Sequence, residues 1–143
     1  MNELYLLSAQ ILLDMCSDED KPAKAWADAV PTNKLRVSVV SVAQARAHCE
    51  AMSDPLERRA LNNKLNILLD SIAADSGAAL PLDEKVASVW QGLNLDAKLE
   101  QANVDQTARQ VYATALAHGL VVVERSRPYH AYLRTLGLEL VSL

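Results

Sequence analysis

The stretch ATALAHGLVVVER (113–125) determines more of the fold than any other part of the chain. Its first half is rich in alanine, the residue with the highest helix propensity. Gly119 follows His118 where this helix must end, because glycine readily adopts the left-handed backbone conformation of a helix C-terminus. The uninterrupted apolar run in LVVVE (120–124) is typical of a strand that helices cover on both faces. The stretch therefore predicts a helix, a glycine stop and a buried strand.

Similar units precede and follow this stretch. Four further segments predict strands, namely LYLL (4–7), LRVSVV (35–40), AALP (78–81) and the weaker LELVSL (138–143). Helices are expected at Ala23–Val30, from an N-cap at Ser41 through Ala51, from Pro55 to near Gly77, at Glu84–Gln91 and at Asp105–Ala117. The alternation predicts an α/β three-layer sandwich with a mostly parallel sheet. At 143 residues, the chain is expected to form a single domain spanning residues 1–143.

Composition narrows the classes of protein to consider. The chain has no long apolar run and no leader-like N-terminus, so we expect a cytoplasmic protein without a membrane anchor. Cys16 and Cys49 lack the paired spacing of a zinc site or disulfide framework, and we expect two buried thiols. The formal net charge of −4 disfavours loose electrostatic attachment to nucleic acid.

Three segments together resemble a known nuclease family. YLLSAQILLDM (5–15), RVSVVSVAQARAH (36–48) and ARQVYATALAHGLVVVERSRPYH (108–130) have the order and spacing of a PIN domain, and within that family the chain is similar to the short VapC-type toxins. The resemblance covers nearly the whole chain. It implies a PIN-like fold, a metal-dependent ribonuclease site, pairing into homodimers and a segment of an antitoxin as partner.

The acidic residues of that family's site are replaced in this chain. The resemblance places the family's metal-binding carboxylates at Ser8, Gln44, Ala108 and Ser126, and a further aspartate at Tyr129. Mg²⁺ prefers carboxylate oxygens, and it activates water and stabilises charge during phosphodiester hydrolysis. Two hydroxyls, an amide and a methyl group hold such a cation poorly. We therefore predict no bound metal, no other cofactor and no catalytic residue at the family position.

A displaced site is the alternative. Asp105 precedes Ala108 by three residues, which is about 4.5 Å along a helix axis. Glu124 precedes Ser126 by two residues, roughly 6.6 Å along a strand. With Asp14, these two acids could form a rearranged Mg²⁺ site. The simpler interpretation makes Asp105 a helix N-terminal carboxylate favoured by the helix dipole and Glu124 an exposed strand end.

Three functional hypotheses follow, and whether the chain is an enzyme stays open among them. The first is a catalytically degenerate PIN-like domain that binds an antitoxin-like or other protein, or associates with itself as a homodimer through apolar residues such as Trp26, Leu61 and Leu65. The second is a metal-dependent ribonuclease of the VapC type with the displaced site. The third is an RNA binder that does not cleave. Its contacts would come from Arg125, Arg127, Tyr129 and His130, which alternatively form only a surface turn around Pro128.

Overall fold

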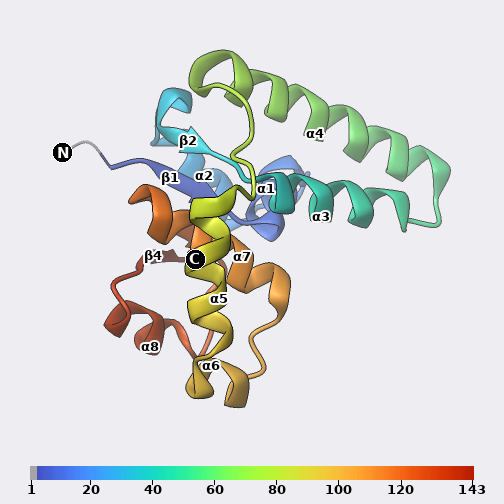
Figure 1. Ribbon diagram of the computed structural model, residues 1–143. Coiled ribbons are helices and arrows are strands. Elements are labelled where there is room, and N and C mark those ends of the chain that lie inside the picture. The colour runs from blue at the N-terminus through green and yellow to red at the C-terminus, as the bar shows by residue number, and fades with distance from the viewer. Residues whose placement is uncertain (1–2) are drawn as a thin grey trace.

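A four-stranded, wholly parallel sheet forms the centre of the computed structural model, which describes residues 3–143 (Figure 1). The strand order is β2-β1-β3-β4. The strands are β1 (Tyr5–Leu7), β2 (Leu35–Arg36), β3 (Val121–Glu124) and β4 (Glu139–Ser142). The helices are α1 (Ala9–Cys16), α2 (Pro22–Asp28), the 3-10 turn η1 (Thr32–Lys34), α3 (Val39–Glu50), α4 (Pro55–Ser76), α5 (Glu84–Asn94), α6 (Ala97–Gln101), α7 (Gln106–His118) and α8 (His130–Thr135).

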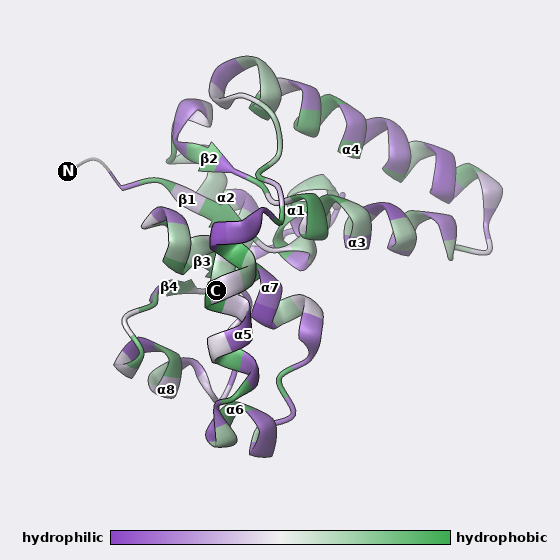
Figure 2. Cartoon of the chain, viewed as in Figure 1, coloured by the Kyte–Doolittle hydropathy of each residue, from purple (hydrophilic) through white to green (hydrophobic). Residues whose placement is uncertain are grey.

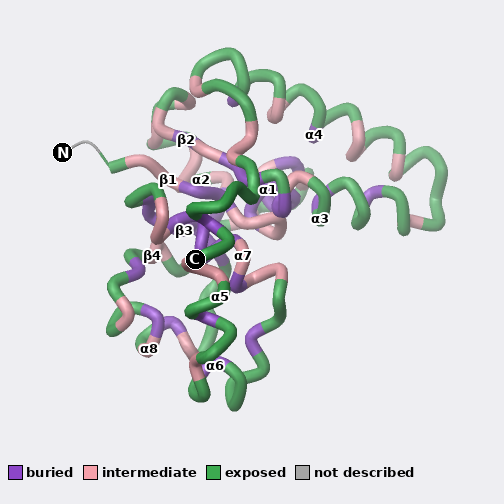
Figure 3. Tube along the Cα trace, in the orientation of Figure 1, coloured by how far each residue is buried: buried purple, intermediate pink, exposed green. Residues whose placement is uncertain are grey.

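Helices cover both faces of the sheet. Leu6 lies opposite Val122, and Leu7 lies opposite Val123, in the parallel register of β1 and β3. Because successive strand residues point to opposite faces, the first pair packs against α5, α7 and α8, and the second pair packs against α1 to α4. The buried positions accordingly concentrate along the sheet and the helix faces turned toward it (Figure 3). This arrangement confirms the α/β class with three layers and a parallel sheet.

Helices α3 and α4 form an arm that extends to one side of the sheet (Figure 1). Within the arm, a 2.8 Å hydrogen bond from Arg46 of α3 to the side-chain oxygen of Asn66 of α4 helps hold the two helices together. Along α4, Leu65 and Ile72 are buried, whereas Ile67 keeps 67% of its surface exposed. Figure 2 shows that hydrophilic residues occupy much of the rest of α4. Leu65 therefore belongs to the core. The sequence had suggested a self-association surface for this residue, and that prediction is wrong for Leu65.

The stretch at 113–125 folds as predicted. Helix α7 ends at His118, and Gly119 adopts a left-handed backbone with φ of 66° while its N–H donates to the carbonyl of Ala115. Strand β3 follows two residues later and is buried along its whole length. The C-terminal strand predicted at 138–143 is also present, as β4.

One predicted strand is shorter than expected, a second is reduced to a single bridge, and one predicted cap is wrong. Ser38, not Ser41, caps α3, because Ser38 has an extended backbone and its hydroxyl accepts the Ser41 N–H at 3.1 Å. The strand expected at 35–40 is therefore cut to two residues. The segment 78–81 contributes only an isolated bridge. In it, the backbone N–H and carbonyl of Leu80 bond to the backbone of the two residues that flank Ser38.

Three helices were not predicted from the sequence, namely α1, α6 and α8. The first of these matters most for the site, because it begins directly after β1. No helix within residues 3–143 is long and apolar enough to cross a membrane.

Candidate functional site

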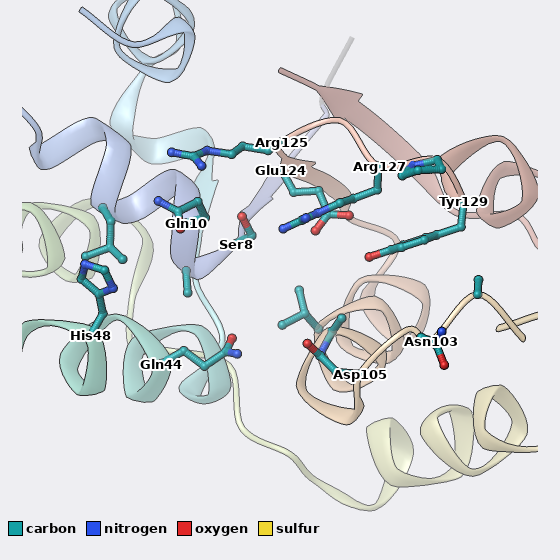
Figure 4. Close-up of a pocket in the computed structure, with 16 residues that line it drawn as sticks. Ser8, Gln10, Gln44, His48, Asn103, Asp105, Glu124, Arg125, Arg127 and Tyr129 are labelled. Atoms are coloured by element: carbon teal, nitrogen blue, oxygen red, sulfur yellow. The ribbon is translucent and has the colours of Figure 1, made fainter. Parts of the chain in front are cut away.

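The candidate site lies where β1 and β3 end. The two strands run parallel, so their carboxyl ends meet at one edge, and the backbone N–H of Ser8 donates to the carbonyl of Val123 at 3.0 Å. Strands β2 and β3 flank β1 on opposite sides, and open α/β sheets bind ligands in the crevice at such a switch point. A hollow of about 720 Å³ opens there (Figure 4). Its polar lining comprises Ser8, Gln10, Gln44, His48, Asn103, Asp105, Glu124, Arg125, Arg127 and Tyr129.

Three of the four family positions line this hollow. Ser8 caps α1, with its hydroxyl accepting the Ile11 N–H at 3.4 Å. Gln44 donates its side-chain amide to the hydroxyl of Thr107 at 2.8 Å, which ties α3 to the start of α7. Ala108 lies in the first turn of α7 and contributes only a methyl group to the lining.

Ser126, the fourth family position, is placed differently. It lines a neighbouring hollow of about 340 Å³ together with Asp14, and its backbone N–H donates to the carbonyl of Leu143 at 3.0 Å. The structure thus brings Ser8, Gln44 and Ala108 together in one hollow without Ser126.

Glu124 is not the exposed strand end expected from the sequence. It is 9% exposed, and one of its oxygens receives hydrogen bonds at 2.5 Å from the Tyr112 hydroxyl and from Nε2 of His130. The other imidazole nitrogen of His130 lies 2.6 Å from the hydroxyl of Ser142. Burial first, and then the negative charge of Glu124, raise the pKa of Tyr112 well above its usual range. The tyrosine therefore stays a neutral donor that holds the carboxylate in place.

Asp14 forms an ion pair behind the site. Arg125 contacts both of its carboxylate oxygens, through Nε at 2.9 Å and through a terminal nitrogen at 2.7 Å, and Gln10 adds a bond at 3.1 Å. Burial by itself raises the pKa of Asp14, but the hydrogen bonds from Arg125 and Gln10 outweigh it and lower that pKa below its ordinary value. Asp14 lines only the smaller hollow, whereas Asp105 and Glu124 line the larger one.

Asp105 caps α7. One carboxylate oxygen accepts the N–H of Ala108 at 2.7 Å and the hydroxyl of Thr107 at 2.9 Å. The expected role of Asp105 at a helix N-terminus is confirmed. Because Asp105 lies just before the first residue of α7, the helical rise assumed between Asp105 and Ala108 does not apply.

The chemistry of these donors does not fit a divalent cation at the family position. Of the three family positions in the hollow, none is a carboxylate, and the two acids that line it are already hydrogen-bonded to neighbouring groups. Across residues 3–143, no three side chains of His, Cys, Asp or Glu gather in a way that could hold a metal ion. Mg²⁺ is usually held through one or two carboxylates with its remaining positions filled by water or phosphate. In this hollow the two carboxylates are Asp105 and Glu124, and each has one oxygen engaged by neighbouring donors.

Sequence reasoning grouped four residues after β3 as possible RNA contacts, and the structure separates them. Arg125, Arg127 and Tyr129 line the hollow, but His130 is 3% exposed and lies beneath it, so it cannot contact a ligand there. Gln10, which the resemblance aligns with the last residue of the family's Asp-Thr-Asn motif, lies in the first turn of α1 and also lines the hollow. Asn103 was missed, because it comes from the α6–α7 loop and carried no signal in the sequence.

The fold has close relatives among known proteins. No family model matches the chain. It is 26% identical over 141 residues to the VapC ribonuclease Y4jK of Sinorhizobium fredii, covering 97% of this chain and 96% of that protein. Among solved structures, FitAcB from Neisseria gonorrhoeae superposes with a TM-score of 0.79 at 20% identity, over 97% of each chain. A VapBC-5 structure from Mycobacterium tuberculosis, a member of the VapBC family of toxin-antitoxin systems, gives 0.70 at 18% identity over 98% of each. These likenesses confirm the resemblance drawn from the sequence and the fold that it implied.

Proposed function

We propose that this chain, a PIN domain of the VapC type, acts by binding a protein partner of the antitoxin kind and not by metal-dependent cleavage of RNA. The single observation that supports this most is the make-up of the hollow at the ends of β1 and β3. Ser8, Gln44 and Ala108 occupy it in place of acids, and Asp105 and Glu124 are engaged in local hydrogen bonds.

A second surface supports the protein partner. A hollow of about 530 Å³ between α1, α2 and α4 is lined in part by the apolar side chains of Met15, Val30, Ile67 and Leu68. Ile67 keeps two thirds of its surface exposed, and such side chains gain most when a partner covers them. The solved VapBC-5 relative belongs to a toxin-antitoxin family, and an amphipathic segment of an antitoxin-like protein suits an apolar groove of this kind.

The metal part of the proposal is tested by comparing the natural chain with a variant in which carboxylates are restored. Ser8→Asp, Gln44→Glu and Ala108→Asp introduce three acids into the hollow beside Asp105 and Glu124. Their repulsion should lower the melting temperature in EDTA, and millimolar Mg²⁺ or Mn²⁺ should raise it again by preferential binding to the folded state. The natural chain should respond by less than about 1 °C and should show no calorimetric metal binding. Tight metal binding by the natural chain contradicts the proposal.

The partner part is tested by Ile67→Asp. We expect this change to weaken association with an antitoxin-like partner, such as a small protein encoded beside this chain, by at least tenfold. Leu95→Asp is the matched control, because Leu95 is 81% exposed, lies outside that groove and receives the same change of charge. Equal effects of the two substitutions, or none from either, would remove the groove from the proposal.

A metal-dependent ribonuclease with a displaced site is the second candidate, and one observation favours it. Asp105 and Glu124 line the same hollow, so two of the three displaced acids do come together. Purified chain with Mn²⁺ would then cleave RNA, and Glu124→Gln would abolish the cleavage while leaving the fold intact. Cleavage that survives Glu124→Gln points to a contaminating nuclease.

A further inference from the structure

A serine, a histidine and a glutamate form a hydrogen-bonded chain that joins β4, α8 and the end of β3. The Ser142 hydroxyl lies 2.6 Å from Nδ1 of His130, and Nε2 of the same ring lies 2.5 Å from a carboxylate oxygen of Glu124. His130 and Glu124 are buried, whereas Ser142 is exposed. A hydroxyl, an imidazole and a carboxylate in this order are the three parts of a serine hydrolase triad, which is recognised by geometry and roles and not by sequence position.

The neighbouring donors determine where the protons of this chain lie. The backbone N–H of Arg127 points at Nδ1 of His130 at 3.4 Å, and since an N–H can only donate, Nδ1 is the acceptor nitrogen of a neutral ring. The ring hydrogen is then on Nε2, which donates it to Glu124. Arg134 donates to the Ser142 oxygen at 3.2 Å, which leaves the hydroxyl hydrogen for Nδ1. The base is therefore unprotonated on the side that faces the hydroxyl, as general-base catalysis requires.

The carboxylate that orients the imidazole is itself held in place. Tyr112 donates its hydroxyl to the same oxygen of Glu124 at 2.5 Å, and burial raises the pKa of Tyr112 well above its usual range, so this donor stays neutral. A carboxylate fixed in this way keeps the hydrogen on Nε2 and stabilises the imidazolium that forms when Nδ1 takes up a proton. Glu124 and Tyr112 are thus positioning residues, which act on the serine through His130.

The serine faces an open edge of the sheet. Among the described strands β4 pairs only with β3, and Leu143 directs its N–H to the carbonyl of Glu124 and its carbonyl to the N–H of Ser126. Because consecutive strand residues direct their backbone groups to opposite sides, the N–H of Ser142 points away from β3, toward the open edge. This N–H and the guanidinium of Arg134 are two donors beside Oγ, where they can stabilise an oxyanion.

We propose that Ser142 is the nucleophile of a triad with His130 and Glu124 that hydrolyses small carboxylic esters at the open edge of β4. Nδ1 of His130 removes the hydroxyl proton as Oγ bonds to the carbonyl carbon, and the same proton passes to the departing alcohol as the ester C–O bond breaks. Water then gives a proton to Nδ1 and attacks the acyl-serine. The bond from Oγ to the carbonyl carbon breaks, Oγ regains a proton from Nδ1, and the carboxylic acid leaves. The exposed position of the serine and two donors for a single carbonyl oxygen fit a short acyl group. This activity goes beyond the proposed function and does not depend on a partner protein.

The test combines covalent labelling by a fluorophosphonate probe, mapped by peptide mass spectrometry, with the hydrolysis of 4-nitrophenyl acetate. We expect Ser142 to be labelled at least tenfold faster than Ser126, and Ser142→Ala to lower ester hydrolysis at least tenfold. Ser126→Ala is the matched control and should change neither rate. Ser126 is also exposed and lies beside the same strand end, and within residues 3–143 its hydroxyl bonds to no imidazole.

The positioning role is tested by Glu124→Gln, which keeps the size of the side chain. An amide can donate to Nε2, and the ring hydrogen then moves to Nδ1, where it faces the serine and removes the base. We expect kcat for ester hydrolysis to fall at least tenfold with KM nearly unchanged, a split that a purely structural role would not produce. His130→Gln should abolish the labelling of Ser142.

Several results would overturn the proposal. No labelling of Ser142 in the natural chain would do so, and so would equal labelling of Ser142 and Ser126. Labelling of Ser142 that persists in a folded His130→Gln variant would show that the hydroxyl reacts without the base. If the substitutions at the two buried positions prevent folding, the exposed serines decide the question. Equal ester hydrolysis by Ser142→Ala and Ser126→Ala would mean that the chain of hydrogen bonds is only structural.

Discussion

The pair formed by Asp14 and Arg125 offers the sharpest test of whether a displaced acid is structural or catalytic. Asp14→Asn keeps the size of the side chain and removes its charge. The carboxylate is buried, with 7% of its side chain exposed, whereas Arg125 keeps 45% exposed, so the loss should lie between that of a surface pair and that of a buried pair. Surface pairs contribute up to about 1 kcal/mol, and breaking buried ones costs about 3–5 kcal/mol. We therefore expect the free energy of unfolding to fall by about 2 kcal/mol.

Urea denaturation at pH 7 measures this loss, with Arg125→Gln and the double variant completing a thermodynamic cycle. The coupling energy between the two positions should be about 1–2 kcal/mol. In a chain of this size, a 2 kcal/mol loss corresponds to a fall of roughly 4–8 °C in melting temperature.

The pH dependence has a definite sign. The pKa of Asp14 is lowered in the folded chain, so its stabilisation is present above the ordinary aspartate pKa and is lost as the pH falls through the folded-state pKa. The difference between the natural chain and Asp14→Asn should therefore shrink on acidification below about pH 4. If Asp14→Asn left the stability unchanged but altered metal binding or RNA cleavage, the structural role of Asp14 would be refuted. Asp14 would then be a member of the displaced metal site.

Three further outcomes are expected. Tyr112→Phe should lower stability by about 1–2 kcal/mol in urea denaturation, because the buried carboxylate of Glu124 loses one of its two donors; a neutral result would mean that water replaces the hydroxyl. Cys16 should react with iodoacetamide at pH 8 far more slowly in the folded than in the unfolded chain, because burial raises the pKa of its thiol to about 11; equal rates would show that the residue is accessible. Light scattering should give a homodimer mass that Leu56→Asp shifts toward the monomer, since Leu56 is 75% exposed on the arm, and a monomer mass at every concentration would contradict the homodimer predicted from the sequence.

The parts of the fold that were predictable are those coded by local chemistry. Gly119 ends α7 because its left-handed backbone suits glycine, and the valines of β3 form a strand because both of its faces are buried. The cap of α3 was not predictable in the same way. Ser38 and Ser41 both carry a hydroxyl, and only the backbone angles, which are extended at Ser38, decide which one caps.

The site was predictable in location but not in its contacts. Ser8, Gln44 and Ala108 come together as the family pattern implied, whereas Ser126 turns toward the chain terminus. The burial of Glu124 depends on Tyr112 and His130, whose positions follow from how α7 and α8 pack on β3 and not from spacing along the sequence. Likewise, Arg125 and Arg127 are chemically identical, and a partner 111 residues away decides that the first is paired and the second is not.

The residues at the positions that the resemblance assigns to acids support local structure and carry no charge. Ser8 caps α1 through its hydroxyl, as an aspartate could, and Gln44 holds Thr107 by donating a hydrogen that a glutamate lacks. The Thr107 hydroxyl already donates its hydrogen to Asp105, so it has none to give to a glutamate at position 44. That glutamate would make no hydrogen bond to Thr107 and would bring a second negative charge near Asp105. Gln44→Glu alone should therefore lower the stability in EDTA by about 1 kcal/mol, and Gln44→Ala, which removes the bond without adding charge, should cost less. If the glutamate variant proved as stable as the natural chain without metal, the hollow would tolerate clustered carboxylates, and charge repulsion would not explain the amide at position 44.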